Sequence, residues 1–129
     1  MIFQYTWARV LSGHKTQTRR LVRDSDRLWT IEHEDRAPEK VLLRGNRTKW
    51  RTGRNYAVQP GRNQKAVARI RLLDIRYQFL GHISEEEARA EGYASLAEFI
   101  ETWKMIHGHF DREQPVWVLE FRLMPEGGA

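Results

Sequence analysis

The feature that most constrains the fold is a β-type pattern from Ala66 to Leu80 whose apolar face changes side half-way along. Alternate residues of a strand share one face, so a shift of one position moves every later side chain to the other face. Both halves of the strand can keep their apolar side chains in one core only if the strand bulges or bends sharply at Leu72–Leu73, as barrel closure requires. The apolar residues before the shift are Ala68, Ile70 and Leu72, and those after it are Leu73, Ile75, Tyr77 and Phe79.

Two helix starts follow this segment. Ser84 and Ser95 each have a glutamate three residues later, which is the capping-box pattern. The glycines at 92 and 108 end the two helices, and Pro115 opens a final strand with alternating apolar residues. Strands with helices inserted between them indicate an α+β fold, most simply a small curved barrel with the Ser84–His107 helical pair across one opening.

The remaining elements are shorter. We expect one domain over residues 1–125 and a disordered tail at 126–129. Phe3, Trp7, Val10 and Leu11 have helical spacing and form one apolar stripe that ends at Gly13. The other predicted elements are strands at 16–22, 27–31, 41–44 and 56–59, a loop at 33–40, and a polar loop at 45–54.

Charge is distributed unevenly along this chain of net charge +5. Residues 40–73 contain ten Lys or Arg and no Asp or Glu, whereas residues 74–129 contain five basic and eleven acidic residues. Such segregation favours contact with a polyanion, because phosphate neutralisation supplies most of the non-specific affinity for nucleic acid. We therefore expect a modified nucleoside or RNA as the partner. A solvated basic surface balanced by acidic helices is the alternative.

The composition excludes several classes of site. The 129 residues contain no cysteine, which rules out disulfides, thiolate zinc sites and a cysteine nucleophile. The five histidines form no recognisable ligand motif, so we expect neither a metal nor a cofactor. No apolar run reaches the length of a membrane span, and the first residues do not resemble a signal peptide. A cytoplasmic protein without membrane contact is expected.

The segment Gly13–Arg20 carries the reactive side chains. Its glycine can take the left-handed conformation, so that the chain turns sharply after the first helix. Lys15 can act as a base toward the Thr18 hydroxyl if burial lowers the lysine pKa, and the pair Arg19–Arg20 can hold an anion. Glu91 lies at the negative end of a helix dipole, so a tertiary partner is expected for it. A basic turn leading into a strand is the simpler interpretation.

The same segment fits the pattern Gly-x-Lys-x-x-x-x-Arg, which Gly13, Lys15 and Arg20 satisfy, and it resembles the ASCH domain. The resemblance spans nearly the whole chain and implies a PUA-like β-barrel with short helices packed at its openings. The further blocks that follow in the order of that family are Tyr56–Ile70, Ile83–Tyr93 and Pro115–Phe121.

The resemblance also implies an activity. Some small ASCH proteins are amidohydrolases that remove the acetyl group from N4-acetylcytidine. Their Lys-x-x-Thr pair matches Lys15 and Thr18, and their catalytic glutamate aligns with Glu91. This chain departs from them by a basic insertion around residues 32–55 and by Arg19 in place of an apolar residue. The insertion leaves open whether the substrate is a nucleoside or RNA.

Two other functions are open at this point: an RNA-binding module without chemistry, and a ribonuclease in which lysine and arginines stabilise the transition-state charge. Trp50 among arginines suits base stacking, and it suits equally well an anchor against the barrel. We expect the basic residues to surround the mouth of the cleft. The expected substrate- or RNA-binding residues are Arg19, Arg20, Arg44, Arg47, Lys49, Trp50, Arg51 and Arg54.

Overall fold

The computed structural model describes residues 1–125, so the tail expected at 126–129 lies outside the described residues. Three α-helices, one 3-10 turn and seven strands make up this part of the chain. In chain order they are α1 Trp7–Leu11, β1 Gln17–Leu21, β2 Asp26–Ile31, β3 Glu39–Arg44, β4 Arg47–Arg51, β5 Asn55–Val58, β6 Ala68–Phe79, η1 Leu80–His82, α2 Glu85–Ala90, α3 Leu96–His107 and β7 Pro115–Leu123.

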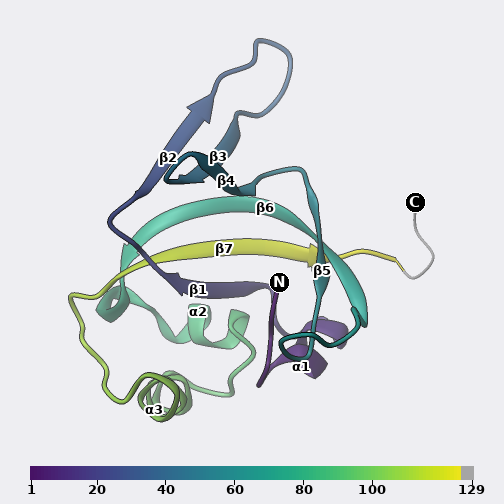
Figure 1. Cartoon of the computed structure of the whole chain (residues 1–129). Helices are drawn as coiled ribbons and strands as arrows, with labels where there is room; N and C mark the ends of the chain where they lie inside the picture. The colour runs from purple at the N-terminus through teal and green to yellow at the C-terminus, as the bar shows by residue number, and fades with distance from the viewer. Residues whose placement is uncertain (126–129) are drawn as a thin grey trace.

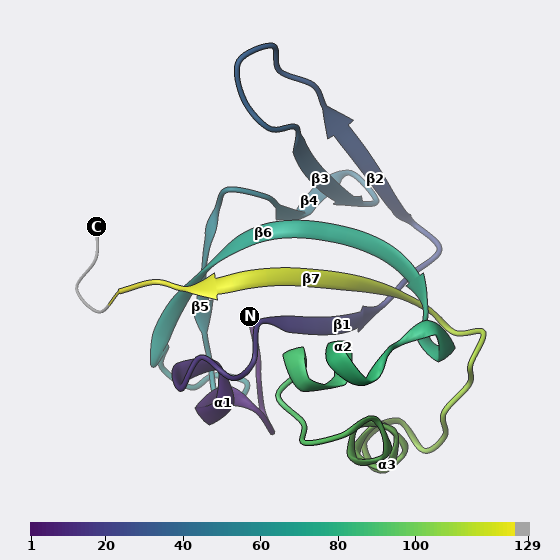
Figure 2. The ribbon, with the colours of Figure 1, turned by 180° about the vertical axis from the view of Figure 1, so that it is seen from behind.

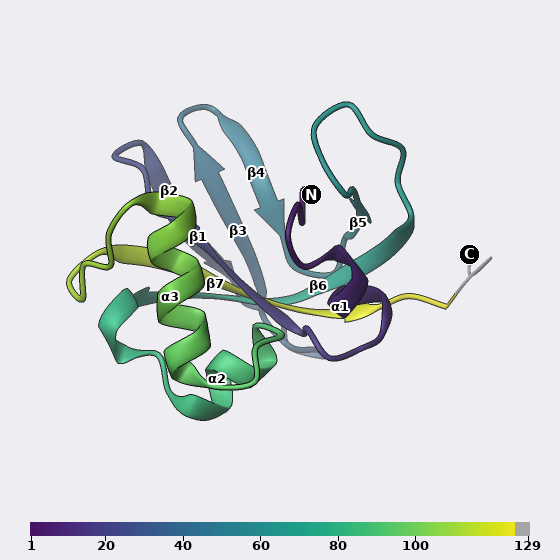
Figure 3. The same ribbon diagram turned by 90° about the horizontal axis from the view of Figure 1, so that it is seen from below.

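The strands form two antiparallel sheets. The four-stranded sheet has the order β1-β7-β6-β5, and the three-stranded sheet has the order β2-β3-β4. The long strands β6 and β7 curve across the middle of the molecule, with β2–β4 on one side and α2 and α3 on the other (Figures 1 and 2). Viewed from below, α3 crosses in front of β7, and α2 lies next to α3 (Figure 3). The fold is α+β, as predicted.

Strand β6 bulges at the predicted place. Its register with β7 shifts between Leu72 and Asp74, which makes Leu73 the extra residue. Ile70, Leu72 and Ile75 are all fully buried, whereas Leu73 is 49% exposed. The bulge therefore keeps the apolar residues of both halves in the core, although Leu73 itself does not join them.

Both predicted helix starts are present. The Ser84 hydroxyl accepts from the Glu87 N–H and the Glu87 carboxylate accepts from the Ser84 N–H, which completes a capping box on α2. Ser95 caps α3 by accepting from the Glu98 N–H, but the Glu98 carboxylate accepts from the Ala94 N–H instead. The second box is thus only half formed, and the cap itself is retained.

The central strand β7 separates two cores. Trp117 and Leu119 on one face pack with Leu42 of the three-stranded sheet. Val116, on the opposite face, packs with Ala88 of α2 and with residues of α3. The two sheets therefore share one core, and the helical pair covers the other face of the four-stranded sheet.

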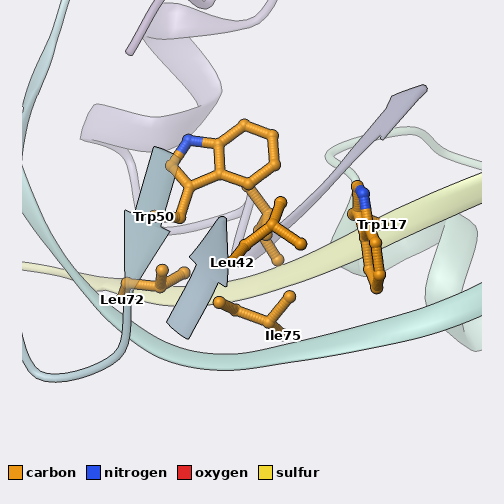
Figure 4. Close-up of a cluster of buried hydrophobic side chains, with 6 residues drawn as sticks. Leu42, Trp50, Leu72, Ile75 and Trp117 are labelled. Carbon is orange, nitrogen blue, oxygen red and sulfur yellow. The ribbon is translucent and has the colours of Figure 1, made fainter. Parts of the chain in front are cut away.

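The polar loop predicted at 45–54 is instead the strand β4, paired with β3. Only Trp50 of its five residues is buried, at 6% exposure, and it packs with Leu42, Leu72 and Ile75 (Figure 4). A strand with a single buried side chain shows no alternation in its sequence, which explains the missed assignment. The burial of Trp50 favours the anchor interpretation over base stacking.

The N-terminal helix is also shorter than its apolar spacing suggests. It begins at Trp7, and the residues before it form an extended segment joined by a bridge from Ile2 to Gln59. Phe3 and Val10 are buried, but Trp7 and Leu11 are each 37% exposed. The stripe therefore contributes two core residues rather than four.

Candidate active site

A cleft of about 260 Å³ lies along β1, which is the edge strand of the four-stranded sheet. The segment 2–6, strand β1, the end of α2 and one side of α3 line it. The polar and aromatic residues of its lining include Lys15, Thr18, Arg19, Arg20, Glu91, Tyr93 and Trp103.

Local backbone geometry brings the start of β1 to the end of α2. Gly13 has φ +81°, so the chain reverses after α1 in the left-handed conformation expected for it. The Lys15 N–H then donates to the Arg9 carbonyl at 3.0 Å, and the Thr16 N–H donates to the Ala90 carbonyl at 2.7 Å. These bonds fix Lys15 opposite the last turn of α2.

A glycine is needed where α2 ends. Gly92 has φ +97°, and a Cβ at this position would lie 3.1 Å from Arg9 Cδ and 3.2 Å from Lys15 Cβ. The absence of a side chain lets the helix end approach Lys15 closely. The residue before it, Glu91, is the C-cap of α2 and points its carboxylate at the same lysine.

Lys15 and Glu91 form a buried, hydrogen-bonded pair. Each is 4% exposed, and the lysine Nζ donates to the Glu91 backbone oxygen at 2.9 Å and to the Glu91 Oε1 at 3.0 Å. Burial lowers the pKa of Lys15, against the raising effect of Glu91 and with a further lowering effect from Arg20 and Arg19. Desolvation is the largest of these effects, so the site favours a neutral amine.

Arg19 holds the other side of the glutamate. Its Nη1 donates to Glu91 Oε2 at 2.9 Å, and its Nη2 donates to Glu87 Oε2 at 2.7 Å. The remaining donors bind the side-chain oxygens of Gln78, at 3.1 and 3.0 Å, and Gln17, at 3.3 Å. The Arg19 side chain is fully buried and every donor nitrogen is engaged, so Arg19 holds Glu91 in place while also lining the cleft. The binding role expected for Arg19 stays a prediction.

Thr18 and Arg20 lie on the opposite face of β1 from Arg19. Thr18 is 5% exposed, lines the cleft, and its hydroxyl makes no hydrogen bond within residues 1–125. Arg20 donates from Nη2 to the Ile2 carbonyl at 2.7 Å and lies 5.3 Å from the centre of the Phe3 ring. Its Nε is buried and has no partner among the described residues. A buried donor of this kind is costly unless a ligand satisfies it.

The structure therefore brings Lys15, Thr18 and Glu91 together in one cleft, with Arg20 beside them. Three more of the expected binding residues, Arg44, Lys49 and Trp50, line a second hollow that Arg20 also lines.

Arg47, Arg51 and Arg54 are absent from the linings of both hollows, as far as the described residues go. Arg51 binds the Glu39 carboxylate instead, with an Nη2–Oε2 distance of 2.6 Å.

Sequence reasoning missed two groups at this site. Glu87 was interpreted only as a capping residue, although the same carboxylate also binds Arg19. The aromatic wall of Tyr93, Trp103 and His107 was also missed; the apolar face of α3 was the only signal for it. The His107 ring lies 4.1 Å from the Trp103 ring, and burial lowers the pKa of His107.

Within residues 1–125, no three or more His, Asp or Glu side chains are grouped closely enough to hold a metal ion. In the same part of the chain, no helix combines the length and the apolar character needed to cross a membrane.

Solved structures with the same fold are known. An ASCH domain from Lactobacillus crispatus JV V101 superposes with a TM-score of 0.63 at 16% identity, covering 94% of this chain and 74% of that one. A protein from Enterococcus faecalis V583, assigned to the family DUF984, superposes with a TM-score of 0.55 at 20% identity, covering 92% and 69%. No family model and no curated protein matches the chain. The chain has the ASCH fold.

Proposed function

We propose that this protein is an amidohydrolase that removes the acyl group from N4-acylated cytosine or cytidine. The observation that carries the proposal is the buried pair of Lys15 and Glu91 beside the unbonded hydroxyl of Thr18, in a cleft with room for a small ligand. The ASCH fold and the match of these residues to the Lys-x-x-Thr pair and glutamate of small ASCH amidohydrolases support it.

The hydrogen bonds of Lys15 suit a general base. A neutral amine has two N–H donors and one lone pair. Both donors are used by Glu91, one on its backbone oxygen and one on its carboxylate. The lone pair on Lys15 Nζ is then free, and it can accept a proton from a hydroxyl or a water molecule in the cleft. Glu91 thus orients the amine, and burial lowers the pKa of Lys15 and so favours the neutral form.

Thr18 supplies the attacking oxygen or holds the water that does. The oxygen forms a bond to the acyl carbon while its proton passes to Lys15, and the carbonyl electron pair moves onto the carbonyl oxygen. When this intermediate collapses, the carbon–N4 bond breaks and Lys15 returns the proton to N4. The products are free cytosine or cytidine and a carboxylic acid; if Thr18 is acylated, water releases the acid by the same proton transfers.

The cleft has donors and apolar surface that suit a cytosine derivative. Arg20 offers its unpartnered Nε–H to a carbonyl oxygen of the substrate. Tyr93, Trp103 and Phe3 supply apolar walls against which a base or an acyl group can pack. Arg20 forms no ion pair within residues 1–125, so its positive charge can stabilise the developing oxyanion.

A product assay with variants tests the proposal. The protein is incubated with N4-acetylcytidine and cytidine release is followed by chromatography, for the wild type and for Lys15→Ala, Thr18→Ala and Glu91→Ala. We expect release by the wild type and a loss of about 10²-fold or more for each variant. Circular dichroism of each variant controls for folding. A wild type that is inert toward acylated cytosine and cytidine while binding RNA would make the protein a binding module instead.

A further inference from the structure

A second hollow adjoins the candidate active site. It has a volume of about 490 Å³ and shares Ile2, Arg20 and Leu21 with the first cleft. Lys49 of β4, Arg44 at the end of β3 and Arg23, just after β1, complete its basic lining. A ligand that fills the first cleft can therefore extend past Arg20 into this second space.

The cations around the second hollow are largely uncompensated. Arg44 is bound by Asp26, with nitrogen–oxygen distances of 2.8 and 3.1 Å. Arg20, Arg23 and Lys49 have no carboxylate within 4.0 Å among the described residues. Three positive charges on one hollow, with the nearby acid already engaged, make a strong positive potential there.

Asp26, the acid next to this hollow, does not neutralise the excess positive charge. Asp26 also accepts from the Arg23 backbone N–H at 2.9 Å and from the Trp117 indole N–H at 2.8 Å. These bonds and Arg44 outweigh the effect of its burial and lower the pKa of Asp26 to about 2, so it stays ionised and bound in place. Burial, followed by repulsion from Arg44, Arg23 and Arg20, lowers the pKa of Lys49. Mutual repulsion of this kind is relieved when an anion binds between the cations.

We infer that the second hollow is a phosphate subsite, so that the preferred substrate is an N4-acylated cytidine carrying a phosphate on its ribose. This inference rests on the proposed function. The base and acyl group occupy the cleft beside Lys15, the ribose passes Arg20, and the phosphate lies between Arg23 and Lys49. Arginine and lysine are the side chains that bind phosphate best, and both types line this hollow.

The first test is a binding experiment that needs no catalysis. Calorimetry compares cytidine with cytidine 5′-monophosphate on the wild type, on Arg23→Ala/Lys49→Ala, and on Arg122→Ala as a control. Arg122 is an exposed arginine of β7 outside both linings. We expect the nucleotide to bind the wild type at least about tenfold more tightly than cytidine, and the double variant to lose that difference while its cytidine affinity is kept. Equal affinities for the two ligands in the wild type would overturn the inference.

The second test separates the sources of the phosphate. Values of kcat/KM are measured for N4-acetylcytidine, for its 5′-monophosphate and for a short RNA containing one N4-acetylcytidine. A preference for either phosphorylated substrate that the double variant abolishes and Arg122→Ala keeps supports the subsite, and the better of the two identifies free nucleotide or RNA as the source. A double variant that loses all three substrates equally contradicts it. Nucleotide binding without any hydrolysis would uphold the subsite and refute the amidohydrolase.

Discussion

Replacement of Arg19 by leucine tests the buried charge network most severely. Its side chain is fully buried and makes five hydrogen bonds to four side chains, including both Glu87 and Glu91. Leucine removes the guanidinium that compensates the charge of Glu91. This carboxylate is 4% exposed, and within the described chain its only remaining side-chain hydrogen bond comes from the Lys15 amine. The variant therefore leaves a carboxylate buried with too little compensation.

The expected cost is about 3–5 kcal/mol of unfolding free energy, the range found when one partner of a buried ion pair is removed. This lowers the folded-to-unfolded ratio by roughly 10²–10⁴. Urea unfolding followed by circular dichroism measures the cost, and the slope against urea should stay unchanged. Arg89→Leu is the matched control. It breaks an exposed pair with Glu85 and should cost about 0.5 kcal/mol or less.

Loss of Arg19 should affect catalysis as well as stability. Arg19 orients Glu91, and Glu91 orients Lys15. Those Arg19→Leu molecules that remain folded should therefore release cytidine more slowly than the wild type. An Arg19→Leu cost below about 1 kcal/mol would refute this account, because it would mean that the network is effectively solvated, like the control pair.

Three further predictions concern the core, the turn and the pH dependence. Trp50→Ala should cost about 3–5 kcal/mol in urea unfolding, and unchanged stability would contradict its role as an anchor. Gly92→Ala should cost about 1–3 kcal/mol and lower the hydrolysis rate, because of its φ of +97° and the 3.2 Å contact with Lys15 Cβ. Since the folded-state pKa of Lys15 lies below 10.5, the unfolded chain binds more protons between the two values, and stability should rise with pH in that window. Lys15→Met should remove this rise relative to the wild type, and identical pH profiles of the two proteins would argue against the lowered pKa.

Sequence patterns predicted the parts of the fold that local chemistry determines. The bulge followed from the position of Leu72 and Leu73, and the helix starts followed from Ser84 and Ser95. Strand β4 was missed because Trp50 is its only buried residue, so the segment has no alternating apolar pattern. Its pairing with β3 is what makes it a strand. Tertiary contacts of this kind leave little trace in a short segment.

Sequence patterns likewise predicted only part of the candidate site. The turn at Gly13 and the odd electrostatic position of Glu91 predicted that Lys15 and Glu91 would find partners. The contacts of Arg19 with Glu87 and Glu91 were not predicted. Arg19 and Arg20 are adjacent, so they point to opposite faces of β1, and which of them meets the carboxylates depends on the packing of α2 against the strand. No local sequence pattern indicates that packing.

The central claim is that Lys15 is a neutral base at the pH where the protein works. Carbon-13 NMR of labelled lysine, recorded across pH, gives the pKa of Lys15 directly, with Lys15→Met to assign its signal. The same pH series gives kcat/KM for N4-acetylcytidine. We expect Lys15 to titrate below its usual 10.5, and kcat/KM to rise with pH through that same pKa. A Lys15 that titrates at or above 10.5 while the protein hydrolyses its substrate at neutral pH would contradict the claim.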